Sequence, residues 1–247
     1  MLMKPIGILG GMGPEATNQM AQLLFSVTPA GCDQDHIPVL VWNNSLLPHR
    51  LDAIWGDGES PVPEMVKMAQ QLEMCGVSHI IMPCNTAHYF IPEIQPNINI
   101  PILDFMRVTS VHIKQHYSFK KVGVLGTNVT TKFGLYRAAL EKYGFEVVDP
   151  CEEDQQAMTD AIYLVKAGQH LAGKAIMDRV ADSLIMKGAE CVVMGCTEIP
   201  LVMKNEEHSV PLVDPSYCVA LETLRLVKEE VGEVVSSEVV AVGELNG

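Results

Sequence analysis

Three short stretches of the sequence occur twice, in the same order along the chain. The first copies are residues 6–10 (IGILG), 76–88 (GVSHIIMPCNTAH) and 100–104 (IPILD), and the second copies are residues 122–126 (VGVLG), 188–199 (GAECVVMGCTEI) and 210–214 (VPLVD). The two copies of each stretch lie 110 to 116 residues apart. Runs of β-branched residues bounded by glycine are typical of buried strands, and an ordered repeat indicates a duplicated unit. The sequence therefore predicts an α/β protein with two similar halves, each a parallel sheet covered by helices.

The segments between these stretches complete the two predicted halves. Helical spacing and capping residues predict helices over residues 14–27, 65–75, 105–116, 157–166, 175–186 and 216–231, and apolar runs predict further strands over 36–42 and 145–149. We place the N-terminal half at residues 1–104, completed by the helix 216–231, and the C-terminal half at residues 105–214. Residues 232–247 form an acidic, poorly patterned tail.

One cysteine stands in each copy of the central repeat. Cys84 and Cys196 each follow an apolar run, and polar residues come directly after them. We expect each thiol at the carboxyl end of a strand and beside a helix N-terminus. There an α/β sheet presents its ligand site and the pKa of a thiol is lowered. If the halves face each other about a pseudo-twofold axis, the two cysteines lie on opposite sides of one cleft.

The matched cysteines allow four interpretations. Two buried thiols can simply be small core residues. A redox pair more often shows the spacing C-x-x-C, which does not occur in this chain. A zinc site could combine Cys84, His88 and Cys196, but no fourth ligand is evident and this spacing is a weak signal. The remaining interpretation is acid–base chemistry on one carbon atom from two faces.

Acid–base chemistry by two thiols has a physical requirement. Inverting a stereocentre removes a proton from one face and returns a proton to the other, so one group must be deprotonated and the other protonated. A free thiol titrates near pH ~8.5, and a helix N-terminus lowers this value. The intermediate carbanion needs donors or positive charge around its carboxylate. The candidates for this role are Arg50, Asn85, Thr86, Thr127, Lys166 and Thr197.

Four longer motifs carry a resemblance to a known family. They are IGILGGMGPEAT at residues 6–17, DQDHIPVLVWNN at 33–44, MPCNTAHYF at 82–90 and MGCTEIPL at 194–201. In this order they resemble the aspartate racemase branch of the aspartate/glutamate racemase superfamily, over nearly the whole chain. The resemblance implies a homodimeric enzyme that interconverts L- and D-aspartate in a cleft between two α/β domains, without cofactor or metal. Glutamate is a further candidate substrate.

The resemblance also implies roles for individual residues. The two catalytic cysteines of the family correspond to Cys84 and Cys196. Its two cations for the substrate carboxylates correspond to Arg50 and Lys166. Its polar contacts after each cysteine correspond to Asn85, Thr86 and Thr197. We also predict substrate contacts for Met12, Ala87, Thr127 and Glu198.

Two positions distinguish this chain from the glutamate racemases of the superfamily. Those enzymes carry Asp-Ser-Gly after the first strand and a His after the second Cys-Thr pair. This chain has Gly10-Gly11-Met12 and Glu198 at these places. Both differences favour aspartate, the shorter substrate.

Composition limits the partners and the compartment. The formal net charge of −13 argues against nucleic acid, because phosphate binding requires a basic surface. No apolar run reaches the roughly 18 residues of a membrane-spanning helix, and the N-terminus lacks a signal-peptide pattern. Seven cysteines without a C-x-x-C pair predict free thiols in a reducing cytoplasm. The partner implied by the resemblance is a small acidic amino acid.

Other functions stay open on the sequence alone. Gly11-Met12-Gly13 with Ala16 partly matches a dinucleotide fingerprint of an oxidoreductase, but the second strand ends in Asn43-Asn44, where an acidic ribose ligand is expected. An inactive relative or a binding protein is disfavoured by the intact cysteine pair. A maleate isomerase or an arylmalonate decarboxylase of the same superfamily uses one such cysteine, so two cysteines favour a racemase.

Overall fold

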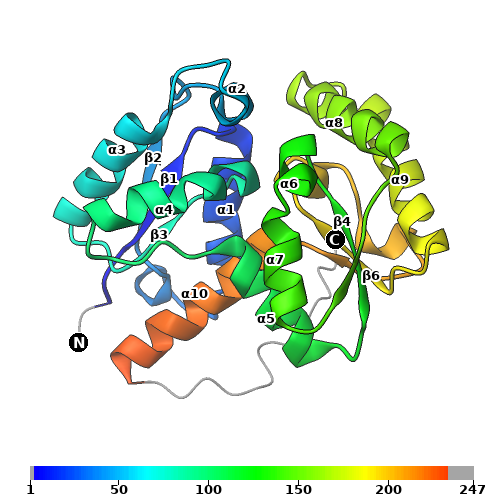
Figure 1. The fold of residues 1–247 in the computed structure, drawn as a ribbon. Coiled ribbons are helices and arrows are strands. Elements are labelled where there is room, and N and C mark those ends of the chain that lie inside the picture. The colour runs from blue at the N-terminus through cyan, green and yellow to red at the C-terminus, as the bar shows by residue number, and fades with distance from the viewer. Residues whose placement is uncertain (1–2, 233–247) are drawn as a thin grey trace.

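The computed structural model describes residues 3–232 as two β-sheets with helices around them (Figure 1). The first sheet has the order β2-β1-β3 and the second has the order β5-β4-β6-β7. The strands are β1 (Ile6–Gly10), β2 (Val39–Asn43), β3 (Ile80–Ile81), β4 (Lys121–Leu125), β5 (Glu146–Val148), β6 (Cys191–Met194) and β7 (Leu212–Val213). Every pairing between these strands is parallel. The predicted α/β class with two similar parallel sheets is confirmed.

The two sheets repeat one another, because β2-β1-β3 corresponds to β5-β4-β6. They differ at the last strand. The second sheet continues with β7, whereas the fourth strand predicted over residues 100–104 is reduced to a single bridge between Ile80 and Ile102. A regular fourth strand in the first sheet was therefore a wrong prediction.

Pro83 explains why the first sheet stops early. Strand β3 has two residues, whereas the equivalent strand β6 has four. After β6, the Gly195 N–H donates a hydrogen bond to the carbonyl oxygen of Leu125 at 2.7 Å. Proline at the equivalent place has no N–H to donate, so the ladder cannot continue. The chain therefore turns away from the sheet directly before Cys84.

Six long helices cover the sheets in the described part of the chain. They are α1 (Pro14–Val27), α3 (Val62–Met74), α5 (Phe105–His116), α8 (Glu152–Lys166), α9 (His170–Met186) and α10 (Pro215–Val231). Each corresponds to a predicted helix, although α3, α8 and α9 begin earlier than expected. The shorter helices α2 (Arg50–Trp55), α4 (Ile91–Ile94), α6 (Asn128–Lys132) and α7 (Leu135–Lys142) were not predicted.

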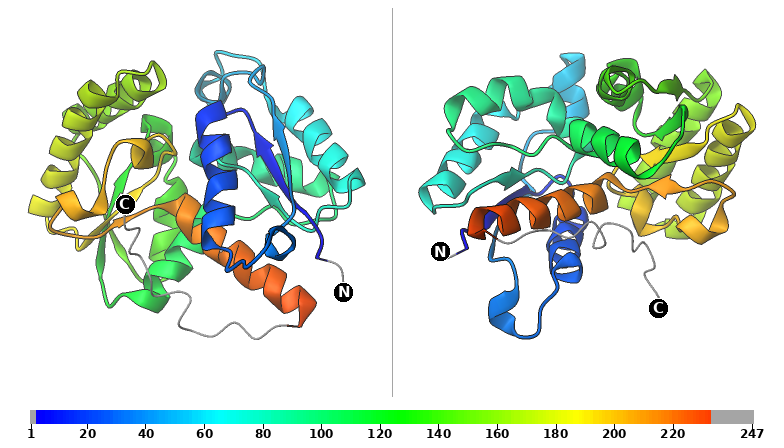
Figure 2. Two further views of the ribbon diagram at one scale, coloured as in Figure 1. Left: turned by 180° about the vertical axis from the view of Figure 1, so that it is seen from behind. Right: turned by 90° about the horizontal axis from the view of Figure 1, so that it is seen from below.

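One hydrophobic core joins the two halves. It includes Ile6 and Ile8 from β1 together with Val124 from β4 and Val193 from β6. Helix α10 packs against both α5 and α1, and Figure 2 shows it reaching from the C-terminal half across to the N-terminal half. The division of the chain at residue 104 and the assignment of α10 to the N-terminal half stay predictions. From residue 233 on, the predicted acidic tail lies outside the described residues.

Equivalent aspartates begin the helices α5 and α10. The Asp104 carboxylate accepts a hydrogen bond from the Met106 N–H at 2.9 Å, and the Asp214 carboxylate accepts one from the Ser216 N–H at 2.8 Å. Such caps satisfy amides that have no partner inside the helix. Burial raises the pKa of Asp214 to about 6. The repeat therefore extends to the residues that start its helices.

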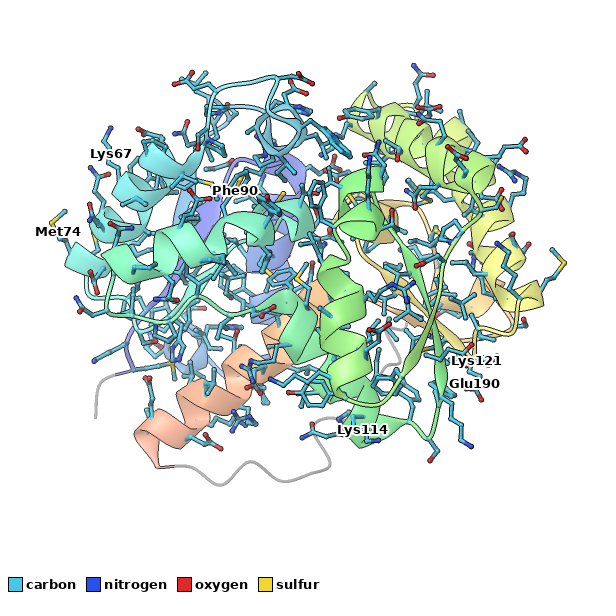
Figure 3. All side chains as sticks on the ribbon, viewed as in Figure 1. Lys67, Met74, Phe90, Lys114, Lys121 and Glu190 are labelled. Carbon is cyan, nitrogen blue, oxygen red and sulfur yellow. The ribbon has the colours of Figure 1, made fainter. Side chains whose placement is uncertain are left out.

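Most charged side chains lie on the outside of the molecule and apolar ones in its core. The charged side chains of Lys67, Lys121 and Glu190 lie at the periphery of the molecule (Figure 3). Phe90, also labelled there, belongs to the buried core of the N-terminal half. Among residues 3–232, no helix is long and apolar enough to cross a membrane.

Candidate active site

A small cavity lies between the two halves, beside both thiols, and has a volume of about 40 Å³. Residues that follow β1, β3, β4 and β6 contribute to it, because parallel strands present their carboxyl ends to one crevice. The predicted residues that line the cavity are Met12, Arg50, Cys84, Asn85, Thr86, Thr127, Lys166, Cys196, Thr197 and Glu198. Ala87 does not line it and is instead buried in the core of the N-terminal half.

Cys84 is the cap of a short 3-10 helix, η2 (Asn85–Phe90), and only 8% of the residue is exposed. Behind it, the Asn85 Oδ1 atom accepts a hydrogen bond from the Tyr136 hydroxyl at 2.5 Å. The Asn85 Nδ2 atom is buried and has no hydrogen-bond partner among residues 3–232. A buried donor without a partner, beside a cavity, is a candidate contact for a substrate oxygen.

Threonine hydroxyls join the two halves next to Cys84. The Thr86 Oγ1 atom lies 3.4 Å from the Thr127 Oγ1 atom. Thr127 also caps α6, where its hydroxyl accepts a hydrogen bond from the Thr130 N–H at 3.4 Å. The cap explains why α6 starts at the carboxyl end of β4 and why Thr127 faces the cavity.

His88 supports the turn at Cys84 and does not line the cavity. Its Nδ1 atom lies 2.9 Å from the Cys84 carbonyl oxygen, and its Nε2 atom lies 3.4 Å from the Leu103 carbonyl oxygen. Burial lowers the pKa of His88, so the ring is neutral at pH 7. Both nitrogens thus face backbone carbonyls. In the described part of the chain, no three His, Cys, Asp or Glu side chains are arranged to hold a metal ion.

Cys196 faces a carboxylate. Its thiol donates a hydrogen bond to Glu198 Oε2 at 2.9 Å, and the 3-10 helix η4 (Ile199–Leu201) begins only after Glu198. Burial raises the pKa of the Cys196 thiol well above its usual value, and the negative charge of Glu198 raises it further. The expectation that a helix N-terminus lowers the pKa of this thiol is therefore wrong.

Glu198 connects Cys196 to Lys166, the last residue of α8. Its second oxygen, Oε1, forms an ion pair with the Lys166 ammonium, and its Oε2 atom lies 3.4 Å from the Thr197 hydroxyl. Burial by itself lowers the pKa of Lys166, but the charge of Glu198 and the hydrogen bond to its carboxylate act against burial, and the pKa is raised overall. Lys166 is therefore a charged ammonium group in the cavity.

Arg50 is the first residue of α2. Its Nη1 group donates hydrogen bonds to the carbonyl oxygens of Pro48 at 2.9 Å and Leu47 at 3.3 Å. Its Nε atom is buried and has no partner within residues 3–232. The guanidinium group is thus held in place by its own chain and keeps a donor available at the cavity.

Four residues that line the cavity were not predicted: His49, Leu51, Ile162 and Tyr163. Ile162 and Tyr163 lie one helical turn before Lys166, so the spacing of residues on one helix face could have found them. His49 and Leu51 are the neighbours of Arg50 in the sequence. No pattern marks them, because α2 itself was not predicted.

Close packing within the chain explains the glycines after β1. A Cβ atom on Gly11, whose φ is +102°, would lie 2.0 Å from the Asn44 carbonyl oxygen. The Gly11 N–H donates a hydrogen bond to the Thr17 hydroxyl at 2.9 Å. A dinucleotide fingerprint needs free amides at this helix start to hold a pyrophosphate. Here the side chain of Thr17 occupies one of them, which weakens the interpretation as an oxidoreductase.

Comparison with known proteins agrees with this geometry. Residues 9–223 match the Asp/Glu/Hydantoin racemase family. A broad specificity amino-acid racemase of Bacillus subtilis is 28% identical over 227 residues, which cover 89% of this chain and 96% of the relative. The structure of Picrophilus torridus aspartate racemase is 28% identical and has a TM-score of 0.82, with 96% of this chain and 97% of that chain covered.

A more distant structure shares the fold alone. Glutamate racemase from Francisella tularensis is 17% identical, with a TM-score of 0.72 and coverage of 96% of this chain and 85% of that chain. The match over residues 9–223 and the Picrophilus structure confirm the resemblance inferred from the sequence motifs. The chain belongs to the Asp/Glu/Hydantoin racemase family and is an isomerase of the racemase class.

Proposed function

We propose that this racemase interconverts L- and D-aspartate by proton transfer between the substrate α-carbon and two thiols. The observation that carries the proposal is that Cys84 and Cys196, one from each half, line the same cavity. They occupy equivalent places in the repeat, so they approach a bound substrate from different halves of the protein. A racemase needs catalytic groups on both faces of the substrate α-carbon, and this arrangement can provide them.

The proposed reaction moves only protons. The Cys84 thiolate removes the α-proton of one enantiomer and becomes a thiol. The electron pair left on the α-carbon is delocalised into the substrate carboxylate. The Cys196 thiol then gives its proton to the opposite face of the carbon and becomes a thiolate. The product is the other enantiomer, and the reverse reaction exchanges the roles of the two cysteines.

The hydrogen bond of Cys196 supports this order in the free enzyme. Its thiol donates to Glu198 Oε2 at 2.9 Å, so the sulfur carries a proton. The substrate enantiomer whose α-hydrogen faces Cys84 then meets a protonated Cys196 on its other side. After one turnover Cys84 carries the proton, and the enzyme is ready for the opposite enantiomer.

The charges at the cavity are the complement of those of aspartate. The cavity holds two cations, Arg50 and Lys166, and one carboxylate, Glu198. Aspartate carries two carboxylates and one ammonium group. A substrate carboxylate at Lys166 competes with Glu198, whose oxygens can then accept the substrate ammonium. The Asn85 amide and the Thr86, Thr127 and Thr197 hydroxyls supply donors for the negative charge that develops on the carboxylate. Glutamate has the same charges, so it is a second candidate substrate.

A direct assay tests the proposed function. The protein is dialysed against EDTA, treated with hydroxylamine to remove any pyridoxal phosphate, and incubated with L-aspartate, L-glutamate or L-alanine. Chiral chromatography is expected to show D-aspartate at the highest rate and D-alanine at the lowest. Activity that is lost on this treatment and returns only with an added cofactor contradicts the proposal.

We also propose that the enzyme is a homodimer of the reducing cytoplasm. Phe25 on α1 and Leu40 and Val41 on the edge strand β2 are exposed apolar side chains, and α1 packs beside β2. A second copy covering them would remove apolar surface from water. The exposed free thiols of Cys32 and Cys151 suit a reducing compartment. Light scattering of the purified protein tests the dimer, and Val41→Asp should shift it to monomer.

A further inference from the structure

A hydrogen bond crosses the cavity from one half of the protein to the other. The Nε2 atom of His49, the residue before α2, lies 3.3 Å from the hydroxyl oxygen of Tyr163 on α8. Both residues line the cavity. The His49 side chain is 44% exposed and Tyr163 is 40% exposed, whereas Cys84 and Cys196 are 8% and 7% exposed. The hydrogen bond therefore lies on the solvent side of the cavity, and Figure 1 shows α2 and α8 facing each other there.

Asp52 sets the orientation of the histidine ring. Its Oδ1 atom lies 2.9 Å from His49 Nδ1. In the neutral ring the Nδ1–H group therefore donates to Asp52, which leaves Nε2 as the acceptor for the Tyr163 hydroxyl. Burial raises the pKa of Tyr163, and Asp52 raises it further, so the phenol keeps the proton that it donates. Donors and acceptors along Asp52, His49 and Tyr163 are thus matched.

The other end of α2 also contacts the opposite half. The ring centroids of Trp55 and Phe133 are 5.3 Å apart, and Lys132 Nζ lies 4.4 Å from the centroid of the Trp55 ring. Helix α2 has no buried residue of its own. It is therefore a surface element that carries Arg50 and touches the C-terminal half at both of its ends.

The size of the cavity limits what this arrangement can hold. A water molecule needs about 10–15 Å³ of such space. A cavity of about 40 Å³ therefore holds a few water molecules but no amino acid. A substrate needs more room than this arrangement offers, and a separation of α2 from α8 would provide it but would break the hydrogen bond between His49 and Tyr163.

We propose that the His49–Tyr163 hydrogen bond is a latch that closes the cavity over the substrate. Re-forming the bond returns Arg50, the next residue after His49, to the cavity. Tyr163 is thus a positioning residue for Arg50. The proposal rests on the proposed function for what enters the cavity, but the closing itself does not depend on it.

Alkylation of the thiols tests the latch without a substrate. The full-length protein is treated with iodoacetamide, and the modification of each cysteine is followed by peptide mass spectrometry. Tyr163→Phe removes only the hydroxyl, and His49→Phe keeps a ring without nitrogens. We expect both to speed alkylation of Cys84 about two- to tenfold, as for the loss of one net hydrogen bond. The exposed Cys151 should react at its wild-type rate.

A matched control removes a hydroxyl elsewhere in the same half. Tyr143 packs against the central core and does not line the cavity, so Tyr143→Phe should leave the alkylation of Cys84 unchanged. Unchanged Cys84 rates in Tyr163→Phe and His49→Phe would overturn the latch. Equal acceleration of Cys84 and of the buried Cys191 would also overturn it, because the change would then be general unfolding.

Kinetics separates the latch from the proposed function. With aspartate as substrate, Tyr163→Phe should raise KM by more than it lowers kcat, because the chemical groups stay intact. If no amino acid is racemised but Cys84 still reacts faster in the variant, the proposed function fails and the latch stands. If racemisation is measured and neither KM nor the alkylation rate changes, the proposed function stands and the latch fails.

Discussion

Cys84 and Cys196 occupy equivalent places in a duplicated fold, but their surroundings differ. Cys84 follows Pro83, and the side chains directly after it, the Asn85 amide and the Thr86 hydroxyl, are uncharged. Cys196 donates a hydrogen bond to the Glu198 carboxylate, which also pairs with Lys166. The repeat accounts for two thiols in one cavity, and the divergence of the residues after each cysteine places a carboxylate beside Cys196.

This difference has a consequence for how the enzyme starts a turnover. In the proposed reaction, two thiols in identical surroundings would have no preferred location for the single proton that they share. A carboxylate beside one thiol stabilises the proton on that sulfur. Glu198 therefore makes the two sides of the cavity different in the free enzyme.

Loss of either cavity thiol should have the largest effect on the rate of racemisation. A serine hydroxyl titrates far above neutral pH, so Cys84→Ser and Cys196→Ser each remove one acid–base group. General acid–base catalysis contributes about 100- to 10,000-fold, and racemisation should fall by this factor in both variants, measured as initial rates by chiral chromatography. Cys151→Ser, at an exposed thiol, is the control. If either Cys84→Ser or Cys196→Ser keeps nearly full activity, the protein would instead be a one-cysteine isomerase or decarboxylase.

Replacing either cation of the cavity, Arg50 or Lys166, should have the second largest effect on activity. Removing a desolvated charge partner costs roughly 2–5 kcal/mol, so Arg50→Ala and Lys166→Ala should each lower kcat/KM about 30-fold or more. Lys166→Ala should have the larger effect, because it also leaves Glu198 without its ion pair beside Cys196. Lys67→Ala, at the periphery, should have no effect. Equal activity of Lys166→Ala and wild type would show that Lys166 only neutralises Glu198.

Glu198→Gln should change the pH dependence more than the maximal rate. Burial and the Glu198 charge both raise the pKa of Cys196, so removing the charge lowers this pKa. A thiol donates a stronger hydrogen bond to a carboxylate than to a neutral amide, so the substitution also weakens the contact that holds the proton on Cys196. The limb of the pH–rate profile that reports Cys196 should move to lower pH. Alkylation of Cys196 should become faster, with Cys84 unchanged, and a profile identical to wild type would contradict the comparison.

Asp214→Asn should affect stability and leave catalysis unchanged. Burial raises the pKa of Asp214 to about 6, above its ordinary value of 3.8, so the folded protein favours the protonated form. The contribution of Asp214 to stability is present below pH ~4 and is lost as the pH rises through about 6. Asparagine keeps the helix cap without the charge. At pH 7.5 it should raise the free energy of unfolding by about 1–3 kcal/mol, with little effect near pH 4, measured by urea denaturation.

Much of the fold could be predicted because the repeat is strong. Alternation of apolar runs and glycines located both sheets, and it placed Cys84 and Cys196 at strand ends. The fourth strand over residues 100–104 was predicted from its match to residues 210–214, but only a single bridge between Ile80 and Ile102 forms there, and no local pattern shows this difference. Short helices such as α2 have too few turns for a periodic pattern, and contacts with the other half help to hold them.

The candidate site could be predicted as a set of residues but not as an arrangement. The ion pair of Lys166 and Glu198 joins residues from two elements, so no local pattern reveals it. The high pKa of Cys196 follows from burial and from the orientation of one carboxylate, and both require the folded structure. The contact of His49 with Tyr163 joins the two halves and was missed for the same reason.

The isotope content of the product tests the central claim most directly. Racemisation of L-aspartate is run in D2O to low conversion, and the deuterium at the α-carbon is measured in both enantiomers. If two thiols act from opposite faces, the donor thiol carries deuterium from the solvent. The D-aspartate formed should then be almost fully deuterated while the remaining L-aspartate keeps its hydrogen. Equal deuterium in the two enantiomers would show that one base serves both faces and would contradict the account.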